Sequence, residues 1–249
     1  MLESLEYKSN QRQWLKQQNY GELDESRLVD AIIGEKNVFK TRKIPERRSF
    51  GGEKKPKRIR FLFDCSGSMY RFDFHDHRLE RSLETFALVS EALEGFEEKI
   101  EWDAYGHSGD SDKIELVQVN KYPKNRKERF AVMDKIAAHA QFCWSGDNTV
   151  ESTQLAIHEL GKEGEGSEDK YVIVISDANF SRYGISPKEF GNILTSDKTV
   201  QAFAIFIGSL GKEAFHLKES LPVGHSFVCE SIESLPAIVE KILSQVVEN

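Results

Sequence analysis

The chain has 249 residues, of which 39% are hydrophobic and 10% aromatic, and it carries a formal net charge of −7. This composition excludes an intrinsically disordered chain, and the acidic balance argues against binding nucleic acid over a wide surface. No apolar run approaches the roughly 18 residues of a membrane helix, and the first residues lack the basic and apolar segments of a secretory signal. Three scattered cysteines indicate neither a disulfide framework nor a zinc site, so we expect an intracellular protein.

The first part of the chain differs from the rest and predicts an amino-terminal extension, residues 1–57. Sparse apolar positions up to residue 34 predict short helical pieces, and residues 35–57, which contain prolines and adjacent glycines, predict a linker. Between Glu35 and Arg60, eleven Lys or Arg residues stand against three Glu, a charge of +8, so the total of −7 leaves −15 for the remainder. The basic stretch is either a docking strap for an acidic partner or a solvated tether that braces its own acidic domain.

From residue 58 onward, short apolar runs alternate with segments whose apolar residues recur every three or four positions. The runs predict strands at 58–64, 100–105, 113–119, 171–175, 200–207 and 226–229, and the periodic segments predict helices at 77–96, 126–139, 149–161, 187–194, 213–220 and 232–247. Strands that alternate with helices favour an α/β fold, with a Rossmann-like, mostly parallel central sheet and helices on both faces. We therefore expect residues 58–249 to form one domain behind the extension.

An acid and two hydroxyls follow the first strand at alternate positions: Asp64, Ser66 and Ser68. The strand reads as buried on both faces, and Gly67 allows the backbone to turn tightly where it ends. Curled into a loop, the three side chains can direct their oxygens at one point. Carboxylate and hydroxyl oxygens, with water, are the ligands of Mg²⁺ or a similar cation. The alternative for each serine alone is a hydroxyl that caps a helix.

Two further loops offer oxygens at the same edge of the predicted sheet. Asp177 ends the apolar strand at 171–175, and the polar loop at 145–149 places Asp147 and Thr149 before a helix. Open parallel sheets bind ligands at the carboxyl ends of their strands, near the point where strand order reverses. The sequence therefore predicts one metal site that joins these two loops to the loop after the first strand.

These residues together resemble the von Willebrand factor A domain family. The segment Asp64-Cys-Ser-Gly-Ser68-Met69, the strand end at Asp177 and the loop at 145–149 are similar to the family's metal-ion-dependent adhesion site (MIDAS), and the resemblance spans residues 58–249. It implies a module that binds Mg²⁺, with Mn²⁺ or Ca²⁺ as alternatives, and whose cation takes an oxygen from a protein partner. Ligand roles carry over to four matching positions: Asp64, Ser66, Ser68 and Asp177.

The loop at 145–149 departs from the family pattern. Most members place a threonine where this chain has Asp147, so either Asp147 replaces that ligand or Thr149 reaches in after a shift of the loop. A third carboxylate would hold the metal more tightly but repel an acidic partner. We therefore expect weaker adhesion to acidic ligands than in integrin-like relatives, or the use of a neutral ligand.

A wider resemblance covers nearly the whole chain. Segments such as Gly106-His-Ser-Gly-Asp110 and the stretches at 176–184 and 202–211 are similar to the carboxyl-terminal region of a family of large mitochondrial proteins that contain a von Willebrand factor A domain. The upstream part of those proteins is an AAA-type ATPase. The resemblance implies a partner module of such a motor, located in mitochondria. No Gly-Lys pair is followed by Ser or Thr in a phosphate-binding-loop pattern, so we expect that the chain itself does not hydrolyse ATP.

The enzymatic alternative is a Mg²⁺-dependent phosphohydrolase of the haloacid-dehalogenase-like type, with Asp64 as the nucleophile. That family needs a second aspartate two residues later, where this chain has Ser66, so the leaving-group acid is missing. The segment at 106–110 resembles a serine-hydrolase elbow but lacks its final glycine, which favours a turn hydroxyl for Ser108. His107 is expected to be a hydrogen-bonded histidine at the rim of the sheet rather than a ligand.

Overall fold

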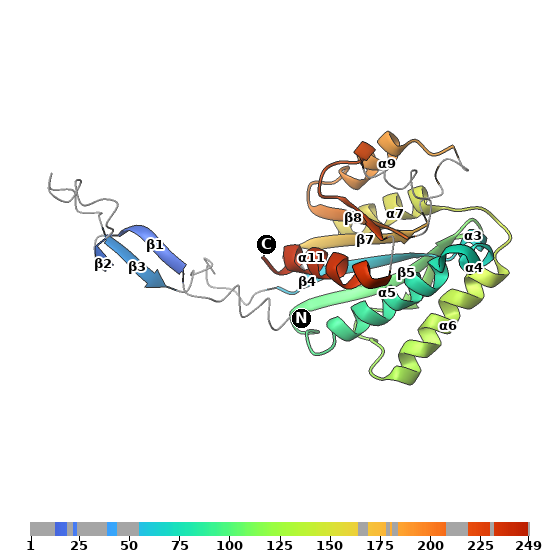
Figure 1. Cartoon of the computed structure of the whole chain (residues 1–249), viewed down its shortest axis with the longest axis horizontal. Coiled ribbons are helices and arrows are strands. Elements are labelled where there is room, and N and C mark those ends of the chain that lie inside the picture. Colours follow the sequence, from blue (N-terminus) through green and yellow to red (C-terminus); the bar gives the residue numbers. More distant parts are fainter. Residues whose placement is uncertain are drawn as a thin grey trace. The chain divides into compact units, whose positions relative to one another are not determined.

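The computed structural model divides into two compact units, residues 1–54 and 55–247 (Figure 1). The residues that it describes are 13–18, 22–23, 39–43, 55–163, 169–177, 180, 184–207, 219–229 and 232–248. The division between the units falls within the basic stretch from Glu35 to Arg60.

The smaller unit holds a three-stranded antiparallel sheet. Its strands, in the spatial order β1-β3-β2, are β1 (Gln13–Gln18), β2 (Glu22–Leu23) and β3 (Phe39–Lys43). The prediction of helical pieces and a linker is therefore wrong at these strands, where Gln13 pairs with the distant Lys43. The spacing of apolar residues within a short stretch cannot reveal a pairing between residues so far apart in the sequence. This pairing holds the backbone of both segments in an extended conformation. The other residues of the expected helices, Gly34 included, lie outside the described residues.

The larger unit is built on a six-stranded sheet with the spatial order β6-β5-β4-β7-β8-β9. The strands are β4 (Lys57–Asp64), β5 (Ile100–Ser108), β6 (Ser111–Val117), β7 (Lys170–Ser176), β8 (Val200–Ile207) and β9 (Ser226–Cys229). All neighbours are parallel except β5 and β6, which form an antiparallel hairpin. The chain passes from β4 to β5 on one side and later returns to β7 on the other, so strand order reverses at β4. The carboxyl ends of β4 and β7 therefore meet where open parallel sheets bind their ligands.

Helices cover both faces of this sheet, as predicted (Figure 1). They are α3 (Gly67–Arg71), α4 (Asp73–Asp76), α5 (Arg78–Ala92), α6 (Arg126–Phe142), α7 (Thr149–Lys162), α9 (Pro187–Leu194) and α11 (Leu235–Glu248), the last preceded by a short 3-10 turn, Ile232–Ser234. Val172 and Val174 of β7 pack in one apolar layer with α7 and α9, whereas Ile173 and Ile175 face the layer beneath α5 and α11. The continuous apolar run of β7 follows from burial on both faces.

The expected and observed helices differ most around α5 and at residues 213–220, and α6 extends to Phe142 rather than ending at residue 139. Two short helices, α3 and α4, precede α5, and α5 ends at Ala92 rather than at residue 96. Helices of four or five residues are too short to show an apolar period. Of the helix expected at 213–220, only Glu219 and Ser220 lie among the described residues, and both are helical.

A network of buried charges joins β4 to β5. The guanidinium of Arg60 binds the carboxylate of Asp103 at 3.0 and 2.9 Å, and Arg58 donates to the same carboxylate. All three side chains have an exposed fraction of 4% or less. The partly exposed Glu159 and Glu163 supply further negative charge. The desolvation cost of two buried guanidiniums can be offset only because carboxylates form ion pairs with them.

Asp103→Ala should destabilise the protein by about 3–5 kcal/mol, because two buried guanidiniums lose their shared counter-charge. Urea unfolding followed by tryptophan fluorescence measures the loss. Asp134→Ala removes an exposed aspartate of α6 and should change stability by less than about 0.5 kcal/mol, which makes it the control. Equal effects of the two substitutions would contradict the role given to the network.

Candidate metal centre

The loop after β4 folds its three predicted oxygen donors into one chain of hydrogen bonds. The Ser66 N–H donates to Asp64 Oδ1 at 2.8 Å, and the Ser66 and Ser68 hydroxyls lie 2.9 Å apart. The Ser68 hydroxyl then donates to Asp177 Oδ2 at 2.7 Å, which joins this loop to the end of β7. All four residues are buried. Ser66 stands at the N-cap position of α3, but its hydroxyl makes no capping bond, so the helix-cap alternative does not hold for it.

The other half of the cluster joins Asp64 to the loop before α7. Ser176 Oγ donates to Asp64 Oδ2 at 3.3 Å and lies 3.3 Å from Thr149 Oγ1. The N–H and the hydroxyl of Thr149 both donate to Asp147 Oδ1, at 3.0 and 2.7 Å. The structure therefore brings together all six residues that the sequence singled out: Asp64, Ser66, Ser68, Asp147, Thr149 and Asp177. Ser176, which links the two halves, was not among them.

Two close approaches between backbones position the loop that carries Asp147. A Cβ on Gly67 would lie 2.4 Å from the Cys143 carbonyl oxygen, and a Cβ on Gly109 would lie 2.5 Å from the Gly146 nitrogen. The Gly109 N–H also donates to the Gly146 carbonyl at 2.7 Å, which ties the tip of the β5–β6 hairpin to this loop. Gly67 is thus required for close approach rather than for the tight turn expected from the sequence.

Three polar atoms in this cluster are buried without a hydrogen-bond partner among the described residues. They are both ring nitrogens of His107 and Oδ2 of Asp147, on side chains whose exposed fraction is 0%. One ligand atom from each of Asp64, His107 and Asp147 lies within 4.8 Å of the other two. Buried polar atoms left in this way are suited to bind a cation. The expectation of a hydrogen-bonded histidine at position 107 is therefore wrong.

Burial and neighbouring charge perturb the titratable groups of the cluster. Burial, with Asp147 and Asp177 close by, raises the pKa of Asp64 to about 7, and burial raises the pKa of Asp147 to about 6. Burial lowers the pKa of His107, so its imidazole is neutral at pH 7. An ionised carboxylate here carries a desolvation cost that a bound cation would offset.

Sequence reasoning missed Arg78, which brings a positive charge into contact with the cluster. Its guanidinium donates to Asp177 Oδ2 at 2.7 Å and, through Nε, to the buried Asp76 carboxylate at 2.9 Å. The Arg78 side chain is 6% exposed, and its guanidinium lies over the ring of Phe72. Arg78 and Asp177 are 99 residues apart, so no local pattern links them.

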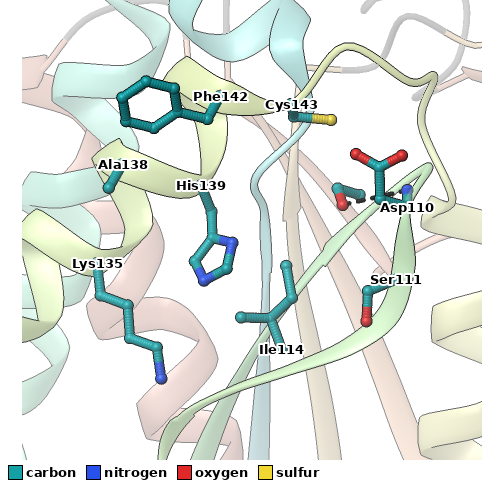
Figure 2. A pocket seen from close by; sticks show the side chains of 9 residues that line it. Asp110, Ser111, Ile114, Lys135, Ala138, His139, Phe142 and Cys143 are labelled. Carbon is teal, nitrogen blue, oxygen red and sulfur yellow. Dashed lines mark hydrogen bonds between the residues drawn. The ribbon is translucent and has the colours of Figure 1, made fainter.

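A groove of about 480 Å³ opens beside the cluster, between the β5–β6 hairpin and α6 (Figure 2). Figure 2 shows Lys135 and His139 of α6 on one side of the groove and Ile114 of the hairpin on the other. The Asp110 N–H donates to Ser108 Oγ at 3.3 Å, which is the turn role predicted for Ser108. The described residues that line the groove include none of the six predicted ligands.

No family model matches the chain. The chain is 47% identical over 244 residues to von Willebrand factor A domain-containing protein 8 of Mus musculus, and this similarity takes in 98% of the chain but only 13% of the relative. The chain thus spans a small part of the length of that protein.

Similar solved structures are distant in sequence. The D319A mutant of the PilB minor pilin from Streptococcus sanguinis has a TM-score of 0.57 at 12% identity, over 86% of this chain and 66% of the pilin. Proximal thread matrix protein 1 from the mussel byssus, in a structure with a zinc-occupied MIDAS motif, has a TM-score of 0.51 at 17% identity, over 78% of this chain and 46% of the mussel chain. Such identities establish a shared fold alone. Residues 55–247 have the fold of a von Willebrand factor A domain, and the chain as a whole is similar to a segment of von Willebrand factor A domain-containing protein 8.

Proposed function

We propose that the chain is a divalent-metal-dependent protein-interaction module of the MIDAS type. Asp64, Ser66, Ser68 and Asp177 would hold the cation, together with either Asp147 or Thr149 from the loop before α7. Their oxygen donors suit Mg²⁺, with Mn²⁺ or Ca²⁺ as alternatives, and a protein partner would complete the shell with one oxygen. The proposal is carried by the convergence of buried oxygens from three loops at the carboxyl ends of β4 and β7. The zinc-occupied MIDAS motif of the mussel protein supports it by analogy.

Asp147 is the stronger candidate for the ligand from the loop before α7. Thr149 uses its N–H and hydroxyl to hold Asp147 Oδ1, while Asp147 Oδ2 is buried without a partner among the described residues. Thr149 would then act as a positioning residue. Its hydroxyl also lies near Ser176, so the same side chain braces two parts of the cluster.

The negative charge of the cluster affects which kind of oxygen a partner can offer to the cation. Asp64, Asp147 and Asp177 together carry three negative charges when ionised, which a divalent cation does not neutralise. Arg78 offsets part of this charge but shares its guanidinium with Asp76. The partner is therefore expected to offer a neutral oxygen, or to bind only weakly through a carboxylate.

Five exposed aromatic residues lie on the segments that border the cluster, and together they are named the aromatic rim: Tyr70, Phe72, Phe74, Phe142 and Trp144. Trp144 is 84% exposed, and the guanidinium of Arg71 lies 4.9 Å from its ring centroid. Exposed aromatic residues of this kind favour a protein interface. We expect the oxygen that the partner offers to be surrounded by apolar side chains that contact the aromatic rim.

The wider setting is proposed from resemblance. Because the chain matches a small part of a much longer relative, we propose that it is the partner-recognition end of an AAA-type ATPase, located in mitochondria, and that any ATPase activity belongs to a separate region. We propose a binding module rather than an enzyme, with no nucleic acid among its partners. Among the described residues, no helix is both long and apolar enough to cross a membrane.

Purified protein should bind Mg²⁺ in calorimetry, and Asp64→Asn and Asp177→Asn should each weaken binding at least about tenfold by removing a charged ligand. Asp147→Thr should also weaken it, and an unchanged affinity would remove Asp147 from the shell. Asp110→Asn changes an exposed acid of the hairpin and is the control, expected to bind as wild type does. Wild-type affinity in Asp64→Asn would contradict the metal site.

Partner capture from a mitochondrial extract should need the metal. Proteins retained on the immobilised chain with Mg²⁺ should be released by EDTA and absent with Asp64→Asn. Trp144→Ala should lower their recovery several-fold, whereas Phe130→Ala, at an exposed aromatic near the opposite end of α6 from Phe142, should not. Capture that ignores the chelator, or phosphatase turnover by the purified chain with Mg²⁺, would contradict an interaction module.

In EDTA, the free energy of unfolding should fall by about 1 kcal/mol between pH 6.5 and pH 8. The folded pKa of Asp64, about 7, lies above its ordinary value of 3.8, so stability present at lower pH is lost as the pH rises through 7. The pKa of His107 is lowered from its ordinary value of 6.5, so its effect on stability has the opposite sign and falls mainly below pH 6.5. The measured pH range therefore starts at 6.5. Asp64→Asn should remove most of the fall, and saturating Mg²⁺ should reverse it. Urea unfolding at the two pH values measures both, and a flat profile in EDTA would show that the carboxylate is not strained by burial.

A further inference from the structure

We propose that His107 is a direct ligand of the cation, so that the site prefers first-row transition metals such as Mn²⁺ and Zn²⁺ to Mg²⁺ or Ca²⁺. This inference rests on the proposed metal site and names the class of ion that it takes. A neutral imidazole nitrogen suits transition metals, whereas Mg²⁺ and Ca²⁺ take oxygen donors. A histidine nitrogen beside carboxylate oxygens is a combination of donors found in Zn²⁺ and other transition-metal sites.

The position of His107 follows from the sheet. It lies near the carboxyl end of β5, directly beside Asp64 in the parallel pairing of β4 with β5, and its carbonyl accepts from the Cys65 N–H at 2.8 Å. The backbone of β5 thus holds the imidazole at the edge where the loop after β4 begins. Its location in the cluster is set by main-chain hydrogen bonds rather than by a flexible loop.

The side chain of His107 has no other evident role among the described residues. It is fully buried, and neither ring nitrogen has a hydrogen-bond partner there. Its Nδ1 lies 3.6 Å from Asp147 Oδ1, which is too far for a hydrogen bond. Leaving a buried polar group unpaired costs free energy, so an imidazole enclosed in this way is explained by a ligand that the protein binds.

The spacing of the donors is close to what a transition metal needs. Ligand atoms of Asp64, His107 and Asp147 lie within 4.8 Å of one another. Donors that bind a tetrahedral Zn²⁺ ion at about 2.0–2.2 Å lie roughly 3.3–3.6 Å from one another. Side-chain movements of roughly 1 Å would bring the imidazole and the two carboxylates to one ion.

Calorimetric titration with Mg²⁺, Mn²⁺ and Zn²⁺ separates this inference from the proposed function. Wild type should bind Zn²⁺ and Mn²⁺ at least tenfold more tightly than Mg²⁺. His107→Gln should weaken Zn²⁺ and Mn²⁺ at least tenfold while leaving Mg²⁺ within about twofold. His75→Gln removes an exposed histidine, and it should change none of the three affinities.

Pulsed electron paramagnetic resonance of the Mn²⁺-loaded wild-type protein gives a second readout that does not depend on how a variant folds. Modulation from a directly bound ¹⁴N nucleus is expected in wild type and in His75→Gln, and should be lost in His107→Gln. Absence of ¹⁴N modulation in wild type, or an equal loss of Mg²⁺ and Zn²⁺ affinity in a folded His107→Gln, would overturn the inference and leave the oxygen site standing. Metal binding that survives Asp64→Asn would instead overturn the proposed function.

Discussion

The main physical constraint on this structure is the negative charge that is buried at one edge of its mostly parallel sheet. Asp64 ends β4, Asp177 follows β7 and Asp147 lies on the loop before α7, and their side chains are withdrawn from water. Like charges so close, in a medium of low dielectric constant, cost free energy unless a positive charge lies among them. Arg78 meets Asp177, but its guanidinium also serves a second carboxylate. A bound divalent cation is the simplest way to balance what remains.

The same strand shows how this protein treats buried charge elsewhere. Nearer its start, β4 carries Arg58 and Arg60, and the carboxylate of Asp103 on the neighbouring strand meets both. The charges of that network are balanced within the fold, because each buried guanidinium forms an ion pair with a carboxylate. At the end of β4, by contrast, Asp64 shares its surroundings with further acids and with an imidazole that has no partner among the described residues. This contrast favours a structural role for Arg58, Arg60 and Asp103, and a binding role for the cluster around Asp64.

The outline of the site followed from the sequence because its ligands stand next to recognisable elements. Asp64 and Asp177 end strands whose apolar runs are unmistakable, and parallel strands bring such ends to one edge. His107 and Arg78 were not assigned their roles, since these depend on which hydrogen bonds the folded surroundings leave open to each side chain. The sheet of the smaller unit was missed for a related reason: its strands pair across a long stretch of chain whose apolar residues show no clear period. The contact of Gly109 with Gly146 is likewise visible only in three dimensions.

Anomalous diffraction from crystals of the protein soaked in Mn²⁺ is the most direct test of a cation at this edge of the sheet. The expected result is a single strong peak within about 2.0–2.3 Å of oxygens from the loop after β4 and from Asp147, with His107 nitrogen in the same shell. No peak at the carboxyl ends of β4 and β7, with Asp64 and Asp147 still buried side by side, would contradict a metal centre and show that the fold tolerates their charge unaided.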